Sequence, residues 1–300
     1  MRERFFQAFI MQIDLGVDRA YILAAGFGTR MGEIGKHLPK PMWPIGPKSI
    51  LELQIDYCLS LGINKIYINT HFLADRITKN LPQSYLEKVE LLYEDPILDS
   101  GGCIHRLASL ESIQYSGNVL VINADQFYLF DPREYAEALK LLKKSRAVLF
   151  GLKVTPDQGY NEIVCQDHIL CDIVKVHNPT VDYITFSGVS LINLEGLARF
   201  NGPSKFFEKV CDYKSEKIYV MQPEESEYWD FGTAPKYLQA MIKLMENKNS
   251  EFLKFLEQCG LNRNEFKKYI QPDLKSVDLE GASRFEFNML RYKKITQQVL

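Results

Sequence analysis

An apolar stretch at residues 20–25 runs without a break into a turn that carries Gly26 and Gly28. The apolar run is typical of a buried strand, and the glycines let the backbone bend and approach a ligand where a Cβ would obstruct it. Backbone N–H groups in such a turn, at the start of a helix, suit phosphate oxygens. Arg30 and Lys40 follow and would supply the positive charge that a polyphosphate needs. The stretch therefore predicts a phosphate-binding strand–turn–helix unit.

Two common glycine-rich loops do not match this turn. A dinucleotide-binding fingerprint requires a third glycine where this chain has Met31. A Walker loop requires Gly-Lys-Ser or Gly-Lys-Thr, whereas this chain reads Gly28-Thr29-Arg30. The alternative that the residues leave open is a tight strand-to-helix turn with incidental basic residues beside it.

Composition is ordinary for a soluble globular protein. The 300 residues suffice for one large α/β domain, alone or with an appendage. With 46% hydrophobic residues, 25% charged residues and a net charge of −2, we expect no nucleic-acid or membrane surface. The six cysteines include no Cys-x-x-Cys pair, which indicates reduced thiols in a cytoplasmic protein. The apolar run near the N-terminus is too short for a signal peptide, and Met11 is an alternative start.

Strands and helices alternate over the first half of the chain. Strands are expected at 20–25, 63–69, 89–93, 117–125 and 147–154, with helices at 49–61, 72–80, 101–110 and 135–144. This alternation predicts a Rossmann-like α/β fold with a mostly parallel sheet and helices on both faces. Ligands bind such sheets beyond the carboxyl ends of the strands, where Gly26, Asn69 and Asp125 all fall.

The second half has a different pattern, with short strands separated by turn residues as in antiparallel pairing. Such strands are expected at 163–164, 169, 173–176, 183–185, 189–192 and 218–221. Helices are expected at 234–245, 250–259 and 263–270. We therefore expect an N-terminal extension at 1–18, one domain at 19–246 and a mainly helical C-terminal appendage at 247–300.

Two aspartates from distant parts of the chain are candidate metal ligands. Asp125 ends the expected strand at 117–125, and Asp230 precedes the expected helix at 234–245. Mg²⁺ prefers one or two carboxylates together with phosphate oxygens and water. The alternatives are a turn acid for Asp125 and a helix N-cap for Asp230.

Taken together, these motifs resemble the signature of the sugar-1-phosphate nucleotidylyltransferases. The run Leu23-Ala-Ala-Gly-Phe-Gly-Thr-Arg30 is followed, after eight residues, by Pro39-Lys-Pro41, which is the family's spacing. Asn123-Ala-Asp125 is similar to the family's Asn-Gly-Asp, and Trp229-Asp-Phe-Gly-Thr233 to its Trp-x-Asp-x-Gly-Thr. Leu98-Asp-Ser-Gly-Gly-Cys103 resembles the Gly-Thr-Gly-Gly run of N-acetylmuramate-1-phosphate uridylyltransferases and of heptose- or mannose-1-phosphate guanylyltransferases. The resemblance covers roughly residues 19–240.

This resemblance implies a glycosyltransferase A-like fold and an enzyme that converts an NTP and a sugar 1-phosphate into an NDP-sugar and pyrophosphate. Its implied catalytic residues are Arg30, Lys40, Asp125 and Asp230, of which the two aspartates would hold Mg²⁺. The implied nucleotide-binding residues are Leu23, Ala24, Ala25, Gly26, Gly28, Thr29, Arg30, Lys40, Asn69, Ser100, Gly101, Gly102 and Asn123. In such relatives the product serves nucleotide-sugar and cell-envelope polysaccharide synthesis.

The acceptor side departs from the family pattern. The family's Tyr-Gly is replaced by Tyr160-Asn161-Glu162, and its Glu-Lys-Pro by His177-Asn178-Pro179. The lysine missing at Asn178 usually neutralises the sugar phosphate, and Lys175 is a candidate substitute or else a solvent-exposed strand lysine. The candidate acceptor-binding residues are Asn161, Glu162, Lys175 and Asn178.

Two other interpretations remain open. One is a cytidylyltransferase for a non-sugar phosphate such as phosphocholine, for which Tyr160, Tyr183 and Phe186 could form an aromatic cage. The other is a non-catalytic, nucleotide-sugar-sensing homologue, which has less need of both Asp125 and Asp230. The base, the sugar and self-association are left undetermined by the residues alone.

Overall fold

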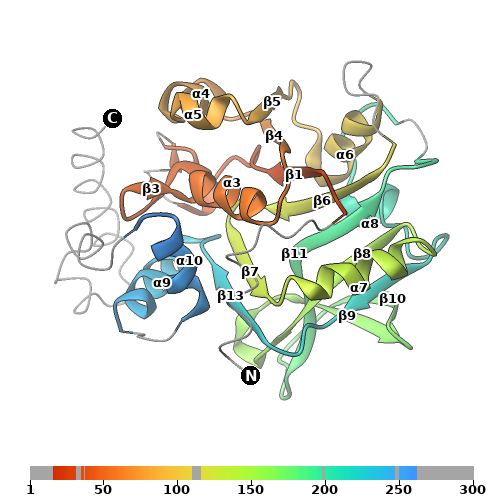
Figure 1. Cartoon of the computed structure of the whole chain (residues 1–300). Helices are drawn as coiled ribbons and strands as arrows, with labels where there is room; N and C mark the ends of the chain where they lie inside the picture. The colour runs from red at the N-terminus through yellow and green to blue at the C-terminus, as the bar shows by residue number, and fades with distance from the viewer. Residues whose placement is uncertain are drawn as a thin grey trace.

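The computed structural model describes residues 16–31, 35–36, 38–109, 116–197, 200–246 and 250–261. At its centre is a nine-stranded sheet with the strand order β5-β4-β1-β6-β11-β8-β12-β10-β9 (Figure 1). The strands of this sheet are β1 (Arg19–Leu23), β4 (Lys65–Thr70), β5 (Val89–Tyr93), β6 (Asn118–Asn123), β8 (Ala147–Val154), β9 (Asn161–Gln166), β10 (Ile169–Lys175), β11 (Tyr183–Asn193) and β12 (Ile218–Met221). Two separate two-stranded sheets pair β2 (Pro44–Ile45) with β3 (Lys48–Ser49) and β7 (Gln126–Phe130) with β13 (Ser226–Asp230).

The sheet changes from parallel to mixed along the chain, as the sequence pattern predicts. Strands β5, β4, β1 and β6 are all parallel. Strand β11 is antiparallel to both β6 and β8, β12 is parallel to β8, and β10 is antiparallel to β12 and β9. Leu23 pairs with Asn69 on one side and with Asn123 on the other. The carboxyl ends of the three central strands therefore lie level with one another.

Helices cover both faces of the sheet (Figure 1). They are α3 (Ile50–Ser60), α4 (Ala74–Asn80), α5 (Gln83–Leu86), α6 (Asp99–Ser109), α7 (Arg133–Leu142), α8 (Phe206–Lys209), α9 (Ala234–Glu246) and α10 (Glu251–Gln258). Buried residues of α3, α7, α9 and α10 share one core with Leu120 and Ile122 of β6. Those of α6 and α8 share a second core with Val119 and Val121. The alternation along β6 is that of a strand buried on both faces.

Helix α3 matches the helix expected at 49–61, and a capping box defines its start. Ser49 Oγ accepts a hydrogen bond from the Glu52 N–H at 3.2 Å, and Glu52 Oε2 accepts one from the Ser49 N–H at 2.8 Å. This reciprocal capping box satisfies two backbone donors at the helix start. One turn further on, Gln54 donates a hydrogen bond of 2.6 Å to the backbone carbonyl of Gln126. The helix thereby fixes the start of β7, which directly follows Asp125.

Strands β7 and β13 were not expected from the sequence. Both pair with a segment far away in the chain, and such pairing leaves no local periodic signal. Strand β11 is a single strand, where two short strands at 183–185 and 189–192 were predicted. The apparent break is a register shift between Phe186 and Ser190, around Gly188 with its positive φ of 85°. A bulge of this kind interrupts the alternation without ending the strand.

Helix α10 lies beyond the predicted domain end at residue 246 but packs into the main core. The ring centroids of Phe252 and Phe127 are 4.8 Å apart, and Ser250 donates a hydrogen bond of 2.6 Å to Glu227. The predicted boundary stays a prediction, and the expected helix at 263–270 lies outside the described residues. No helix of the described part is long and apolar enough to cross a membrane.

Candidate active site

The glycine turn leaves β1 at the level of the neighbouring strand ends. Gly26 is exposed and a Cβ there would meet no atom within 4 Å, whereas Gly28 has a positive φ of 64°. The Met31 N–H donates to the Gly28 carbonyl at 2.9 Å and closes a short 3-10 helix, η1 (Thr29–Met31). A 3-10 turn of three residues therefore stands where a helix start was expected. Arg30 is exposed on this turn and has no ion pair with the described residues.

Asn69 holds this turn against the sheet. Its Oδ1 accepts a hydrogen bond of 2.6 Å from the Ala24 N–H, and its Nδ2 donates one of 2.9 Å to Glu94. Glu94 is completely buried, and its second carboxylate oxygen accepts from the Leu98 N–H at 2.9 Å. Because Asn69 is itself buried and bonded on both sides, the structure gives it a positioning role. Its predicted contact with a nucleotide stays a prediction.

His71 supports the same turn from outside. Its ring packs edge-to-face on Phe27, with centroids 5.2 Å apart, and its Nδ1 lies 2.8 Å from the backbone oxygen of Glu94. Phe27 is 47% exposed. His71 therefore has a structural role in supporting the glycine turn, which is more common for a histidine than contact with a ligand.

The two candidate metal ligands lie side by side. In the β7–β13 pair Asp230 is opposite Gln126, and the Phe231 N–H donates to the Asp125 carbonyl at 2.9 Å. A Cβ placed on Gly232 would lie 2.8 Å from Asp230 Oδ1 and 2.9 Å from Asp125 Oδ2. Both carboxylates therefore face one small space that exists because residue 232 has no side chain.

Each carboxylate has its own ammonium group. Lys40 donates to Asp125 Oδ2, and Lys236 donates to Asp230 Oδ2 at 2.8 Å. The Tyr160 hydroxyl bonds to Asp230 as well, and the Lys236 Nζ lies 4.0 Å from the centroid of the Tyr160 ring. Burial and the neighbouring Asp230 carboxylate raise the pKa of Tyr160, so the phenol stays a neutral hydrogen-bond donor. The four charged groups are formally neutral as a set.

Lys236 is a residue that the sequence analysis missed. It lies in the first turn of α9, where the helix dipole disfavours a cation. That unfavourable position, only six residues after Asp230, is a signal that could have singled it out.

The carboxylate pair fits a magnesium ion. Two convergent carboxylates beside a space that a Cβ would fill are a suitable protein share of a Mg²⁺ site, with phosphate oxygens and water completing it. Within the described ranges no group of three or more histidine, cysteine or acidic side chains could hold a metal. A cation here would therefore complete its coordination shell with water, or with the oxygens of a bound ligand.

The two glycines at the start of α6 have a packing role. The N–H groups of Gly101 and Gly102 both donate to the Ser204 carbonyl, at 2.8 and 3.1 Å. A Cβ on Gly102 would lie 2.3 Å from the Gly202 carbonyl oxygen. Their side-chain-free surfaces thus accommodate the segment at 202–205, and their contact with a base stays a prediction.

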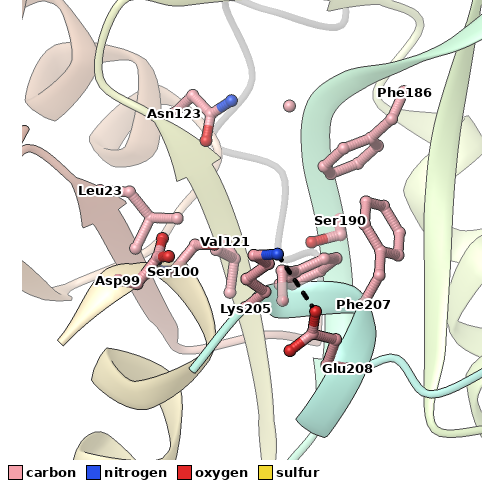
Figure 2. Close-up of a pocket in the computed structure, with 12 residues that line it drawn as sticks. Leu23, Asp99, Ser100, Val121, Asn123, Phe186, Ser190, Lys205, Phe207 and Glu208 are labelled. Carbon is pink, nitrogen blue, oxygen red and sulfur yellow. Dashed lines mark hydrogen bonds and ion pairs between the residues drawn. The ribbon is translucent and has the colours of Figure 1, made fainter. Parts of the chain in front are cut away.

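A pocket of about 430 Å³ opens between the ends of β1 and β6, the middle of β11 and the starts of α6 and α8. Figure 2 shows Leu23 and Asn123 on one side, Phe186 and Phe207 on the other, and Ser190 between them. The rings of Phe186, Phe206 and Phe207 contact one another, with centroids 5.0–5.8 Å apart. The Ser190 hydroxyl is completely buried and has no hydrogen-bond partner among the described residues. Three predicted nucleotide-binding residues line this pocket: Leu23, Ser100 and Asn123.

The four predicted acceptor-binding residues do not line the pocket. Asn161 and Lys175 are exposed and paired across β9 and β10, and Asn178 is exposed with a positive φ of 50°. The proposed aromatic cage is also not assembled. The Tyr160 hydroxyl is directed to Asp230, Tyr183 is buried, and only Phe186 faces the pocket.

The described residues define a class of α/β proteins. In this class a glycine turn and a carboxylate pair lie at the carboxyl ends of the parallel strands, where ligands bind. A family model for nucleotidyl transferases matches residues 19–170, just over half of the chain. The chain therefore belongs to the nucleotidyl transferase family.

Relatives and solved structures agree with this assignment. The chain is 33% identical over 247 residues to the UTP–glucose-1-phosphate uridylyltransferase of Synechocystis, covering 74% of this chain and 62% of that protein. It is 31% identical over 115 residues to the D-glycero-alpha-D-manno-heptose 1-phosphate guanylyltransferase of Campylobacter jejuni, covering 38% of this chain and 50% of that protein. The chain thus spans less than two thirds of these relatives. The crystal structure of HddC from Yersinia pseudotuberculosis with GMP-PN shares the fold, with a TM-score of 0.61, 22% identity, and coverage of 76% of this chain and 99% of that one.

Proposed function

We propose that the protein is a sugar-1-phosphate nucleotidylyltransferase that makes an NDP-sugar and pyrophosphate from an NTP and a sugar 1-phosphate. The observation that supports this most is the convergence of Asp125 and Asp230 beside Gly232, with Lys40 bonded to Asp125. The activities named for the uridylyltransferase and guanylyltransferase relatives point the same way. The cytoplasm is the proposed location, which is consistent with the six free cysteines.

In this proposal the glycine turn and its cations bind the triphosphate. The backbone at Gly26 and Gly28 lies against the phosphates, Arg30 neutralises the pyrophosphate that leaves, and Lys40 faces the reacting phosphate. Asp125 and Asp230 hold Mg²⁺, which when bound reduces the repulsion between two anionic substrates and polarises the α-phosphate.

The transfer step then depends mainly on orienting the two substrates and neutralising their charges, and it needs little covalent catalysis by the protein. An oxygen of the acceptor phosphate forms a bond to the α-phosphorus, and the bond from that phosphorus to the bridging oxygen breaks. The electron pair leaves with pyrophosphate. No general base is needed, because a phosphate monoester is already an anion at neutral pH. All the residues named come from one chain, so the site does not require self-association.

The pocket between Asn123 and Phe186 is the proposed place for the non-phosphate part of a substrate. Its three phenylalanine rings suit the apolar face of a sugar or base. The Ser190 hydroxyl, which has no hydrogen-bond partner in the described part of the chain, suits a hydroxyl or amide of the ligand. Asn161, Glu162, Lys175 and Asn178 stay proposals for an outer part of the acceptor site.

The test is a pyrophosphate-release assay with Mg²⁺, four nucleotides (UTP, GTP, CTP and dTTP) and a panel of acceptors. The acceptors are glucose 1-phosphate, mannose 1-phosphate, a heptose 1-phosphate and phosphocholine. We expect release that depends on one sugar 1-phosphate and on Mg²⁺. Release with phosphocholine alone, or tight nucleotide binding without release for any pair, would contradict the proposal.

A further inference from the structure

The proposed reaction brings two strongly anionic groups together, and the described site offers few cations to neutralise them. Arg30 and Lys40 both follow the glycine turn and so belong to the triphosphate side. Next to β13 and the start of β9, and bonded to the other carboxylate, the structure has Lys236. Lys175, the substitute predicted from the sequence, is exposed at the end of β10.

We propose that Lys236 binds the acceptor phosphate, and that it is released for this role when Mg²⁺ replaces it at Asp230. The inference rests on the proposed function. In the structure the Lys236 ammonium lies 2.8 Å from Asp230 Oδ2 and 4.0 Å from the centroid of the Tyr160 ring. The lysine thus forms an ion pair with one of the two carboxylates that would bind the cation.

The charges of Lys40, Lys236, Asp125 and Asp230 are compatible both with a site without substrates and with a site that holds a divalent cation. Without substrates, Lys40 and Lys236 balance Asp125 and Asp230, so two partly buried carboxylates are never left unpaired. When a divalent cation takes both carboxylates, the same four side chains plus the cation carry a net charge of +2. Lys236 then has an unmatched charge at the space where the carboxylates converge, which favours a phosphate dianion there.

Tyr160 keeps Lys236 in place during the exchange. Its hydroxyl bonds both to Asp230 and to Lys236, and its ring lies under the ammonium. A cation above an aromatic ring remains attracted after its carboxylate partner has been lost. Tyr160 is therefore a positioning residue for Lys236.

A binding measurement without substrates tests the exchange. Mn²⁺ alone is titrated into the full chain and followed by electron paramagnetic resonance, for the wild type and for Lys236→Met. Because the variant removes the competitor for Asp230, we expect Mn²⁺ to bind about five- to tenfold tighter. Lys243→Met is the matched control, since Lys243 is exposed on the same helix two turns later, and its affinity should equal that of the wild type. Unchanged or weaker binding by Lys236→Met would overturn the exchange.

Steady-state kinetics test whether Lys236 binds the acceptor phosphate. The acceptor is the one that the release assay identifies. Lys236→Met should raise the KM for the sugar 1-phosphate about tenfold or more and leave the KM for the nucleotide nearly unchanged. Lys236→Arg should recover most of the loss, because a guanidinium also binds phosphate. A rise confined to the nucleotide KM, or a fall in thermal stability with both KM values intact, would contradict the proposal. If no acceptor supports turnover, the proposed function fails. The Mn²⁺ titration would still test whether a cation replaces Lys236 at Asp230.

Discussion

Asp125 and Asp230 are neighbours across the end of the β7–β13 ribbon, with Asp230 opposite Gln126 and Phe231 bonded to the Asp125 carbonyl. A short antiparallel pair thus unites carboxylates from the two halves of the chain. The ribbon is held by α3 through Gln54 and by the core beneath α10. The carboxylates are consequently fixed before any ligand arrives, which is what preorganised charge stabilisation requires.

Replacing either carboxylate by an amide should remove most turnover. Asp125→Asn or Asp230→Asn deletes one negative ligand of the cation, and we expect a rate loss on the order of a hundredfold or more in pyrophosphate release. Circular dichroism should show an intact fold. Asp182→Asn is the control, since Asp182 is exposed and pairs only with Lys153 among the described residues. Near-normal release from either active-site variant would refute its role.

Arg30→Ala should reduce turnover without affecting stability. Arg30 is exposed and has no ion pair within the described part of the chain, so its removal costs the fold nothing. Loss of its charge from the leaving pyrophosphate should slow release on the order of a hundredfold. The rate is compared with the midpoint of thermal unfolding, and a parallel fall in both would argue against a role in the reaction.

Removal of metal should abolish activity and leave the fold unchanged. Lys40 and Lys236 pair with the two carboxylates and can neutralise them when no cation is bound. Chelation therefore exposes no unpaired buried charge, and the unfolding midpoint with and without a chelator should agree. A large drop in that midpoint would indicate a structural metal.

Ser190→Ala should have opposite effects on stability and on substrate binding. The Ser190 hydroxyl is buried without a partner among the described residues, and such a group costs about 1–3 kcal/mol. Its removal should leave the free energy of unfolding equal or higher, while the KM for the substrate that occupies the pocket rises. Urea denaturation and steady-state kinetics measure the two quantities. A destabilised variant with unchanged KM values would exclude a ligand contact.

Gly188→Ala should destabilise the protein through the bulge in β11. Gly188 has a φ of 85°, and a Cβ there would lie 2.5 Å from Asn123 Nδ2 and 2.2 Å from Gln126 Oε1. We expect a loss of about 2–3 kcal/mol from the left-handed backbone and the broken Asn123–Gln126 hydrogen bond.

Gly159→Ala is the matched control for this substitution. Gly159 has a similar φ of 68°, but nothing lies within 4 Å of the position of its Cβ. Only the backbone cost of about 1–2 kcal/mol should remain. Equal losses in the two variants would show that contact with the Asn123 side chain is unimportant.

Local signals in the sequence predicted the parallel half of the fold well. The apolar periodicity of residues 49–61 was enough for α3, and a short apolar run was enough for β12. The β7–β13 ribbon was not predictable in this way, because its pairing joins distant segments. The glycine turn and the two aspartates were identified singly, but only the fold brings Asp125 and Asp230 together.

Two contacts of the site are visible only in the structure. Gly101 and Gly102 are predicted nucleotide-binding residues, and the structure shows in addition that the 202–205 segment packs against them. A glycine pattern does not distinguish a ligand from another backbone as the group that approaches. Lys236 belongs to no expected motif, and its pairing with Asp230 and Tyr160 becomes visible only in three dimensions.

The most direct test of the central claim is a crystal structure with Mg²⁺ and non-hydrolysable analogues of UTP or GTP. The account predicts a metal ion bound to both Asp125 and Asp230, with the triphosphate along residues 26–30. A cation that touches neither carboxylate, or phosphates bound away from the glycine turn, would contradict it.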